Sequence, residues 1–484
     1  MGRGGTRCRG GDRVSGIVDV DATELARLIR GREVSCAEVM TAYLDRIEAY
    51  NPAVNAIVAL RERSVLLAQA RERDDELRDG RYRGWMHGFP LAVKDLAAAA
   101  GFPLTHGSPV FADQVAEADD LFVRRMRDAG AIVIGKTNVP EFGFGSHTYN
   151  PVYGVTRNPY DLSRTAGGSS GGAAAAVALR LLPVADGSDY LGSLRNPAAF
   201  CNVLGLRPSA GRVPSPGWLP QLSTAGPMGR TVADVAAFLG VLAGPALEDP
   251  LSLESAPAET GERDVRGTRV AWVGDWRGYL ATEPGVLDVC RRACDVLAGL
   301  GCVVEDALPD FAPERVWRSV LAWRAWNAVS KLGSLTAAQV DQLKPELRWE
   351  LDRGRELTVD ELTLAVAERD AWYAAVLELF ERYDFVLAPS AQVFPFDVEL
   401  TWPREVGGRA MDTYHRWMET VAPWSLAGVP ALGMPAGFDA RGLPMGVQLI
   451  GPPRADQAVL RLAHAYEQVT HYPTAHPPEP SLAG

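Results

Sequence analysis

The sequence TAGGSSGGAAAAVALRLLPVADGSDYLGSLRNPAAF, residues 165–200, contains two glycine turns that each carry serine. The first turn, GGSSGG, includes Ser169, and the second, GSDYLGS, ends at Ser193. The alanine-rich segment between them is typical of a helix. Glycines beside a serine allow unusual backbone dihedrals and bring bare N–H groups close to a bound molecule. The stretch therefore predicts a serine nucleophile with an oxyanion hole, but it contains no histidine to act as the base.

A lysine is the candidate for that base. Lysine occupies only positions 94, 136, 331 and 344 among 49 Lys and Arg residues, which leaves 49 − 4 = 45 arginines. Lys94 lies near the end of the apolar run GFPLAVKDL. A lysine removed from water can lose its proton and act as a base, whereas arginine stays protonated. We therefore expect Lys94 to be catalytic; the alternative is a lysine that only ends a strand.

Together with further motifs, these residues resemble the amidase signature family. The motifs are PLAVKDL, GKTNVPEF (135–142), GGSSGG (167–172), and GSDYLGSLRNPAAF followed by GLRPSAGRV (205–213). Their order fits the family over most of the chain. The resemblance implies a Ser–cis-Ser–Lys triad, in which Ser193 is the nucleophile, Ser169 the relaying cis-serine and Lys94 the base.

The chemistry of the three side chains agrees with this assignment. A serine hydroxyl is a weak nucleophile unless a base lies within hydrogen-bond reach. Neutral Lys94 can accept a proton from Ser169 while Ser169 accepts one from Ser193, because a hydroxyl both donates and accepts. This relay explains the presence of a second serine turn.

The turn before the nucleophile departs from the family pattern. The family usually has threonine, isoleucine or a small residue followed by two glycines, whereas this chain has Tyr190, Leu191 and Gly192. We expect the backbone N–H groups of Tyr190, Leu191, Gly192 and Ser193 to form the oxyanion hole, since any non-proline residue supplies one. The two larger side chains are expected to shape the substrate pocket.

Other residues are expected to support the site or to line it. Asp189 and Arg195 flank the nucleophile and are expected to pair; the alternative is two separately solvated charges. Lys136 is expected to be structural. The complete set of expected supporting and pocket residues is Ser170, Asp189 and Arg195, and Gly143, Phe144, Gly145, Tyr190 and Leu191.

Two other interpretations of GGSSGG are weaker. Residues 167–171 formally match the G-x-S-x-G elbow of α/β-hydrolases, but that elbow needs a hydrophobic strand before it, and RNPYDLSRT is not one. A flexible linker would not run directly into an alanine-rich helix. We therefore favour the catalytic interpretation.

Composition limits the class of protein. The chain has 484 residues, 47% of them hydrophobic, and can bury a large core. A net charge of −11 argues against nucleic-acid binding, and no apolar stretch reaches transmembrane length. The seven histidines form no metal-ligand motif, so we expect no metal and no cofactor. Six scattered cysteines fit reduced thiols and a cytoplasmic location.

The order of predicted elements indicates an α/β fold. Apolar runs such as PLAVKDL, AIVIGKT, LLPVAD, RVAWVGDW, CVVEDAL, DFVLAPS and MGVQLIG predict strands that alternate with helices. We expect one large domain over residues 19–484, with a central mixed sheet covered by helices on both faces. Its core motifs lie in 83–245, residues 1–18 form a disordered leader without the apolar run of a signal peptide, and residues 245–264 form a linker loop.

A helical, tryptophan-rich region is predicted over about 312–380. Its tryptophans can pack in the core, or they can form a lid that binds an apolar or aryl group. They are Trp317, Trp323, Trp326, Trp349 and Trp372. Four aromatic residues at and after GKTN are expected on the other side of the pocket, namely Phe142, Phe144, Tyr149 and Tyr153.

The predicted function is hydrolysis of an amide C–N bond through an acyl-enzyme. Bulky or aryl amides are favoured, and carbamates (urethanes) present the same carbonyl. The partner is then a small-molecule substrate, for a monomer or homodimer. Two alternatives remain at this stage. One is a glutamine-hydrolysing amidotransferase subunit for tRNA-linked transamidation, and the other is a catalytically inactive binding member of the family.

Overall fold

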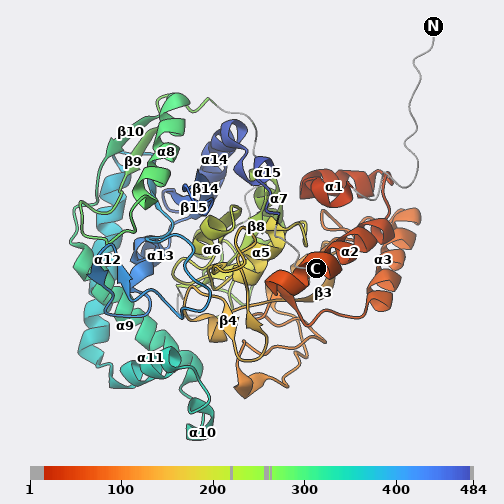
Figure 1. Ribbon diagram of the computed structural model, residues 1–484, viewed down its shortest axis with the longest axis horizontal. Helices are drawn as coiled ribbons and strands as arrows, with labels where there is room; N and C mark the ends of the chain where they lie inside the picture. Colours follow the sequence, from red (N-terminus) through yellow and green to blue (C-terminus); the bar gives the residue numbers. More distant parts are fainter. Residues whose placement is uncertain (1–15, 218–221, 255–260, 262–263, 480–484) are drawn as a thin grey trace.

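The computed structural model describes residues 16–217, 222–254, 261 and 264–479, and a mixed eight-stranded sheet lies at its centre (Figure 1). Its three strands at one edge are parallel and the other neighbours pair antiparallel. This confirms the expected α/β class. The strands are, in spatial order, β10 (Val303–Asp306), β9 (Arg269–Trp272), β11 (Phe385–Pro389), β15 (Pro444–Ile450), β14 (Ala431–Phe438), β7 (Leu204–Arg207), β8 (Thr224–Gly229) and β6 (Ala185–Asp189).

A separate three-stranded sheet carries the predicted lysine strand, in the order β1 (Ile57–Val58), β3 (Ile132–Thr137) and β2 (Pro90–Lys94). The expectation of one continuous sheet is therefore wrong at this point. Strand β2 lies next to β6. There the backbone N–H of Lys94 donates to the carboxylate of Asp186, at 3.2 and 3.3 Å, so a side chain takes the place of the carbonyl of a backbone ladder.

Helices cover both faces of the central sheet, as the sequence predicts (Figure 1). Those nearest the sheet are α5 (Gly171–Ala178), α6 (Arg195–Phe200), α7 (Val232–Leu242), α8 (Val286–Gly299) and α14 (Asp456–Thr470). At the amino-terminal side lie η1 (Ile17–Asp19), α1 (Ala22–Arg30), α2 (Cys36–Val54), α3 (Arg63–Arg78) and α4 (Leu121–Asp128).

The tryptophan-rich region is helical, as predicted, and forms a layer beside the sheet (Figure 1). It comprises α9 (Pro313–Leu332), α10 (Ala337–Val340), α11 (Pro345–Glu356) and α12 (Val359–Phe380). The remaining short elements are η2 (Pro109–Phe111), η3 (Glu141–Gly143), β4 (Tyr149–Asn150), β5 (Gly154–Val155), β12 (Glu405–Val406), β13 (Arg409–Ala410), η4 (Arg416–Val421), α13 (Ala422–Ala427) and α15 (Tyr472–Ala475).

The small residues of the deciding stretch allow close packing. All eight residues of α5 are buried. A Cβ added to Gly172 would lie 2.4 Å from the backbone nitrogen of Asn138, so a side chain does not fit there. The alanines that follow are equally enclosed, and helix α5 is therefore held by its own backbone shape against the lysine-bearing sheet.

The two segments that the sequence assigns to irregular structure are only partly described. Residues 1–15 of the expected leader lie outside the described residues, whereas Ile17 and Val18 are buried in η1. Of the expected linker, residues 245–254 form turns, and residues 255–260 and 262–263 lie outside the described residues.

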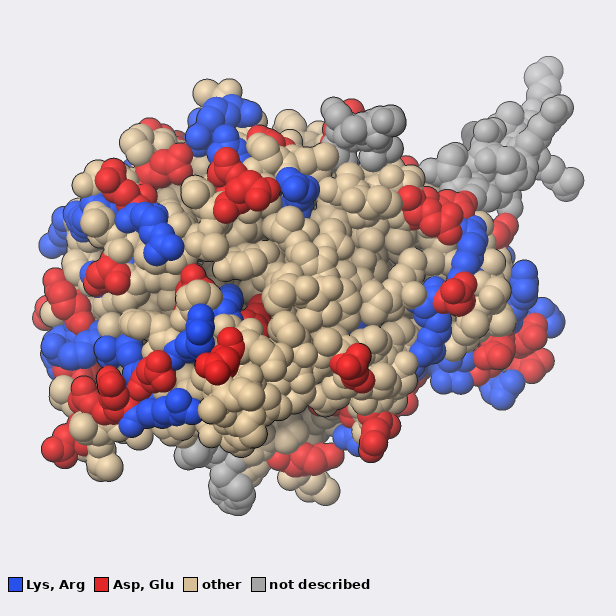
Figure 2. Space-filling view, turned by 60° about the horizontal axis from the view of Figure 1, so that its bottom comes forward, with Lys and Arg blue, Asp and Glu red and all other residues tan. Residues whose placement is uncertain are grey.

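Charge and hydropathy of the described chain agree with a folded core and a mixed surface. On the face drawn in Figure 2, Lys and Arg side chains alternate with Asp and Glu around a broad uncharged middle. None of the helices in the described ranges is both long and apolar enough to cross a bilayer. The five described cysteines are buried free thiols.

The contact between β14 and α6 generates a stability prediction. A Cβ on Gly433 would lie 2.8 Å from Cα of Arg195, against the helix backbone. We expect Gly433→Ala to lower the free energy of unfolding by about 1–3 kcal/mol through overpacking. Urea denaturation measures this. The matched control is Gly240→Ala in α7, where nothing lies within 4 Å and the alanine should stabilise by up to about 1 kcal/mol. Equal stability of Gly433→Ala and wild type would contradict the packing argument.

Candidate active site

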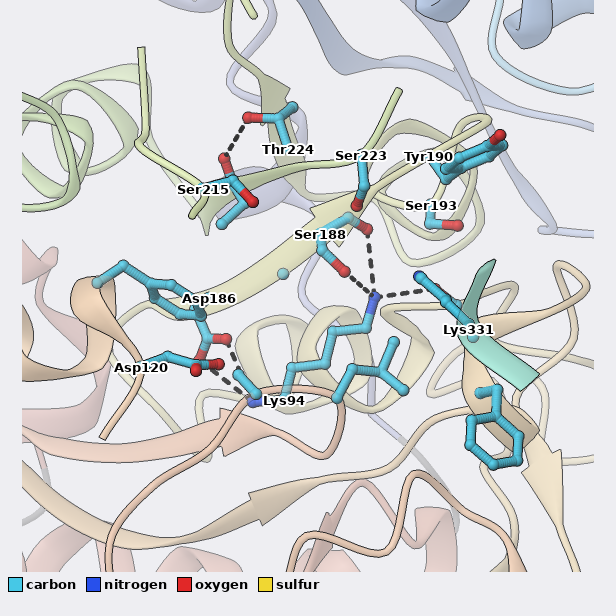
Figure 3. A pocket seen from close by; sticks show the side chains of 18 of the residues that line it. Lys94, Asp120, Asp186, Ser188, Tyr190, Ser193, Ser215, Ser223, Thr224 and Lys331 are labelled. Carbon is cyan, nitrogen blue, oxygen red and sulfur yellow. Dashed lines mark hydrogen bonds between the residues drawn. The ribbon is translucent and has the colours of Figure 1, made fainter. Parts of the chain in front are cut away.

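A cavity of about 310 Å³ lies where the two serine turns meet the lysine strand (Figure 3). Lys94, Ser169 and Ser193, which the sequence predicts to act together, all line it. Its wall combines apolar and polar side chains. The other lining residues are Leu96, Ala97, Asp120, Leu121, Phe122, Phe142, Gly143, Phe144, Asp186, Gly187, Ser188, Tyr190, Pro214, Ser215, Pro216, Ser223, Thr224, Ala225, Arg324, Asn327 and Lys331.

Lys94 is at the centre of a hydrogen-bonded cluster. Its Nζ lies 2.8 Å from Oγ of Ser169 and 2.8 Å from Oγ of Ser170. It also contacts the hydroxyl and the carbonyl oxygen of Ser188, at 3.0 and 3.2 Å (Figure 3). A carbonyl can only accept, so Lys94 donates to Ser188 O. In a neutral amine the lone pair is then free to accept the hydroxyl proton of Ser169.

Burial favours the neutral form of this lysine. The Lys94 side chain belongs to a residue that is 1% exposed, and loss of hydration lowers its pKa to about 7. The carboxylates of Asp186 and Asp189 act in the opposite direction but do not cancel this effect. Burial also raises the pKa of Asp186 to about 6. Near neutral pH, Lys94 is therefore able to exchange a proton with its neighbours.

The two serine turns are joined to each other through the backbone. The Gly168–Ser169 peptide bond is cis, and the next residue, Ser170, donates its N–H to the carbonyl oxygen of Ser193 at 3.2 Å. Ser193 is 6% exposed and faces the cavity. Within the described part of the chain, no group hydrogen-bonds its hydroxyl. Ser193 Oγ is thus available to a bound molecule.

The carboxylate of Asp189 fixes the second turn. It accepts hydrogen bonds from the N–H of Gly192 at 2.7 Å and of Leu194 at 3.2 Å. Arg195 forms the expected ion pair with it, at 3.0 Å, and Arg207 adds a second cation at 3.3 Å. Although burial alone would raise its pKa, the two guanidinium groups hold the pKa of Asp189 well below its usual range.

The bonds of Asp189 sort the N–H groups of the turn into two kinds. The N–H of Gly192, which the sequence suggests as an oxyanion donor, is already bonded to Asp189. In the described structure, the N–H groups of Tyr190, Leu191 and Ser193 have no acceptor. Three of the four expected donors thus remain unpaired beside the cavity, and the fourth is a structural bond.

Comparison with known proteins agrees with this arrangement. The sequence profile of the Amidase family matches residues 38–460. The chain belongs to the amidase signature family. It is a hydrolase of this family that acts on amides.

Three similar proteins illustrate the range of this amidase family. An acylamidase of Rhodococcus erythropolis is 35% identical over 460 residues, which cover 93% of this chain and 95% of the relative. The A-type chain of the glutamyl-tRNA(Gln) amidotransferase of Chloroflexus aurantiacus is 34% identical, covering 92% and 95%. The crystal structure of a bacterial aryl acylamidase has a TM-score of 0.88 and 28% identity, covering 95% of this chain and 98% of that one.

Some of the expected pocket residues of this amidase lie elsewhere. Gly143, Phe144 and Tyr190 line the cavity, but Leu191 is 2% exposed and packs in the hydrophobic core. Its expected role in the pocket is wrong because the chain turns its side chain inward, away from the cavity. Gly145 borders a different small cavity, so that expectation is also wrong.

The expected aromatic lid is not made by tryptophans. Among the described residues that line the cavity there is no tryptophan, and Tyr149 and Tyr153 are outside it as well. Phe142 and Phe144 do line it. Helix α9 reaches the cavity with polar residues, while its Trp317 packs in the core. A helix presents one face to a cavity, and here the tryptophans lie on the others.

Several residues of the site were missed at the sequence level. Ser188 and Asp186 precede the nucleophile on β6 and contact Lys94, and Arg207 follows on β7. Alternation along a strand placed Ser188 on the same side as Asp186 and would have indicated a contact with the lysine. Lys136 bonds the carbonyl of Ala97 at 2.6 Å, in keeping with a structural role.

The buried cluster around Asp189 generates a second prediction. We expect Asp189→Ala to lower the free energy of unfolding by about 3–5 kcal/mol, because it leaves two buried guanidinium charges unpaired. Denaturant titration monitored by fluorescence measures this. Asp45→Ala is the control, since the exposed pair of Asp45 with Arg63 is worth at most about 1 kcal/mol. A loss for Asp189→Ala as small as that of the control would contradict the role assigned to this carboxylate.

Proposed function

We propose that this protein hydrolyses bulky or aryl amides through an acyl-enzyme formed on Ser193. The observation that carries the proposal is the 2.8 Å contact between Lys94 Nζ and Ser169 Oγ in the cavity that Ser193 faces. A desolvated amine beside a hydroxyl is the arrangement that a proton relay needs.

In the first half of the reaction, Ser193 attacks the amide carbonyl. Its Oγ forms a bond to the carbonyl carbon while its proton passes to Ser169, and the proton of Ser169 passes to neutral Lys94. The developing oxyanion accepts hydrogen bonds from backbone N–H groups, for which those of Tyr190, Leu191 and Ser193 are unpaired. Asp189 keeps this turn in place but does not touch the reacting atoms.

In the second half, the relay runs in reverse and then repeats. The protonated Lys94 returns its proton through Ser169 to the leaving nitrogen, the C–N bond breaks, and the free amine departs. A water molecule then gives its proton to the relay and attacks the acyl carbon, and the release of the acid regenerates the Ser193 hydroxyl. One amide bond and one water molecule are consumed, and no redox change occurs.

The lining of the cavity supports an apolar or aryl substituent on the substrate. Phe122, Phe142, Phe144 and Tyr190 contribute aromatic surface, and Leu96 lies among them. Aromatic and apolar side chains with a few polar groups are typical of pockets for such ligands. The similarity to an aryl acylamidase and to an acylamidase points in the same direction. Carbamates, which present the same carbonyl, belong in the same substrate panel.

The alternative function is glutamine hydrolysis in an amidotransferase. Similarity to the A-type chain of glutamyl-tRNA(Gln) amidotransferase favours it. Hydrolysis of anilides by the purified chain alone, without partner subunits, separates the two. We propose that the chain works in the cytoplasm, as a monomer or homodimer on small-molecule substrates, and its buried free thiols agree with a reducing compartment.

The nucleophile can be identified by covalent labelling. We expect a fluorophosphonate or a sulfonyl fluoride to give one adduct on Ser193 by mass spectrometry. Ser193→Ala should lose the adduct, and kcat should fall by at least about 10³-fold. Ser215→Ala, which changes another serine of the same cavity, is the control and should keep the adduct. Labelling of Ser169 with Ser193 untouched would reverse the assignment.

The base determines the pH dependence. Lys94 must be neutral to accept a proton, and its pKa is lowered to about 7 by burial. We therefore expect kcat/KM for a neutral anilide to rise about tenfold per pH unit below pH 7 and to level off above it. Lys94→Arg should be as inactive as Lys94→Ala, because a guanidinium stays protonated. Circular dichroism confirms that the variants are folded. Substantial activity in Lys94→Arg would refute the mechanism.

A further inference from the structure

One face of helix α9 presents a row of polar side chains to the cavity. Arg324, Asn327 and Lys331 are spaced by three and four residues, so they lie one above the other along the helix. All three line the cavity, and the catalytic mechanism uses none of them. Their side chains bring hydrogen-bond donors to a wall that a purely apolar substrate does not need.

Lys331 is a cation without a counterion. Within the described structure it makes no ion pair and no hydrogen bond. Figure 3 shows its side chain pointing toward Lys94 and Ser193. The other three lysines each have hydrogen-bonded partners, Lys94 with serines, Lys136 with Ala97 and Lys344 with Phe144. In a chain that uses arginine for nearly every other cation, this lysine is directed at the reaction centre.

The charge of the neighbouring Arg324 is already balanced. Its guanidinium pairs with buried Glu350 and also donates to the hydroxyl of Tyr414. The row therefore has one uncompensated positive charge, that of Lys331. One unpaired charge matches a monovalent anion such as a carboxylate better than a doubly charged phosphate.

Asn327 is an unpaired polar group in the same row. It is 4% exposed, and its Oδ1 is buried without a hydrogen-bond partner in the described structure. Its amide NH₂ has no partner there either. Leaving a buried amide unpaired is unfavourable, so such a group in a cavity wall indicates a missing ligand. Beside Lys331, its NH₂ can donate to the same anion.

The remaining charges of the cavity make this end distinct. Asp120 and Asp186 also line the cavity, and in Figure 3 they lie away from Lys331. A carboxylate on the substrate is repelled from those two residues and attracted to Lys331. The cavity thus has an acidic and a basic end, and Ser193 lies nearer the basic one in this view.

We infer that Lys331 and Asn327 bind a carboxylate of the substrate, so that the preferred substrates are amides that carry an acidic group. The inference rests on the proposed amide hydrolysis and narrows it. The carboxylate accepts hydrogen bonds from the Lys331 ammonium and the Asn327 NH₂, and it orients the amide carbonyl toward Ser193. Arg324, fixed by Glu350, holds the wall in shape.

The test compares acids with neutral analogues of the same shape. The probes are ortho-, meta- and para-acetamidobenzoate and the three matching acetamidobenzamides. We expect kcat/KM for the best acid to exceed that of its neutral partner at least about tenfold. Lys331→Met should remove this preference, Lys331→Arg should keep part of it, and Asn327→Leu should reduce it. Arg318→Met, which removes an exposed cation from the same helix outside the cavity, should leave it unchanged.

Binding provides a readout that does not depend on catalysis. Calorimetry with Ser193→Ala and the same acids should show affinity that falls at least about tenfold when Lys331→Met is added. Equal ratios and equal affinities with and without Lys331 would overturn the inference while leaving amide hydrolysis intact. So would an upward shift of the pH midpoint for acids and neutral amides alike, since Lys331 would then act only on Lys94. Absence of all hydrolysis, with Lys331-dependent binding retained, would refute the proposed function and support the anion site.

Discussion

The ion cluster around Asp189 is the interaction on which the rest of the site depends. Its carboxylate joins two buried guanidinium groups, from α6 and β7, to the backbone of the turn that ends at Ser193. Arg195 also bonds Gln448 on β15 and Ser425 on α13. One buried charge thus connects four elements that are far apart in the sequence. The shape of the nucleophile turn is therefore a property of the whole central sheet.

The lysine reaches this turn from a different sheet. Lys94 lies on the last position of β2, and the side chain of Asp186, on β6, accepts its backbone N–H. Serine hydroxyls and a carbonyl then surround the amine, so that its burial is matched by polar partners rather than by an opposite charge in contact. This is why desolvation dominates and the amine loses its proton readily.

The sequence predicts the chemistry of the site better than its walls. Glycines, serines and a rare lysine mark Lys94, Ser169 and Ser193 because that chemistry needs those residue types, and the fold class follows from alternating apolar runs. The direction of a side chain depends on tertiary packing, and this is where the prediction for Leu191 is wrong. The break between the two sheets was equally invisible, since a carboxylate at position 186 replaces a backbone ladder.

The close packing of α5 has a consequence for how such a protein changes over time. Because the helix touches neighbouring backbone at Gly172, even a methyl group would displace the segment that carries Ser169. The wall made by α9 has no such restriction, since its side chains end in open space. Substitutions that alter substrate choice can therefore accumulate on α9 without disturbing the proton path. The fold separates a rigid chemical centre from a replaceable recognition surface.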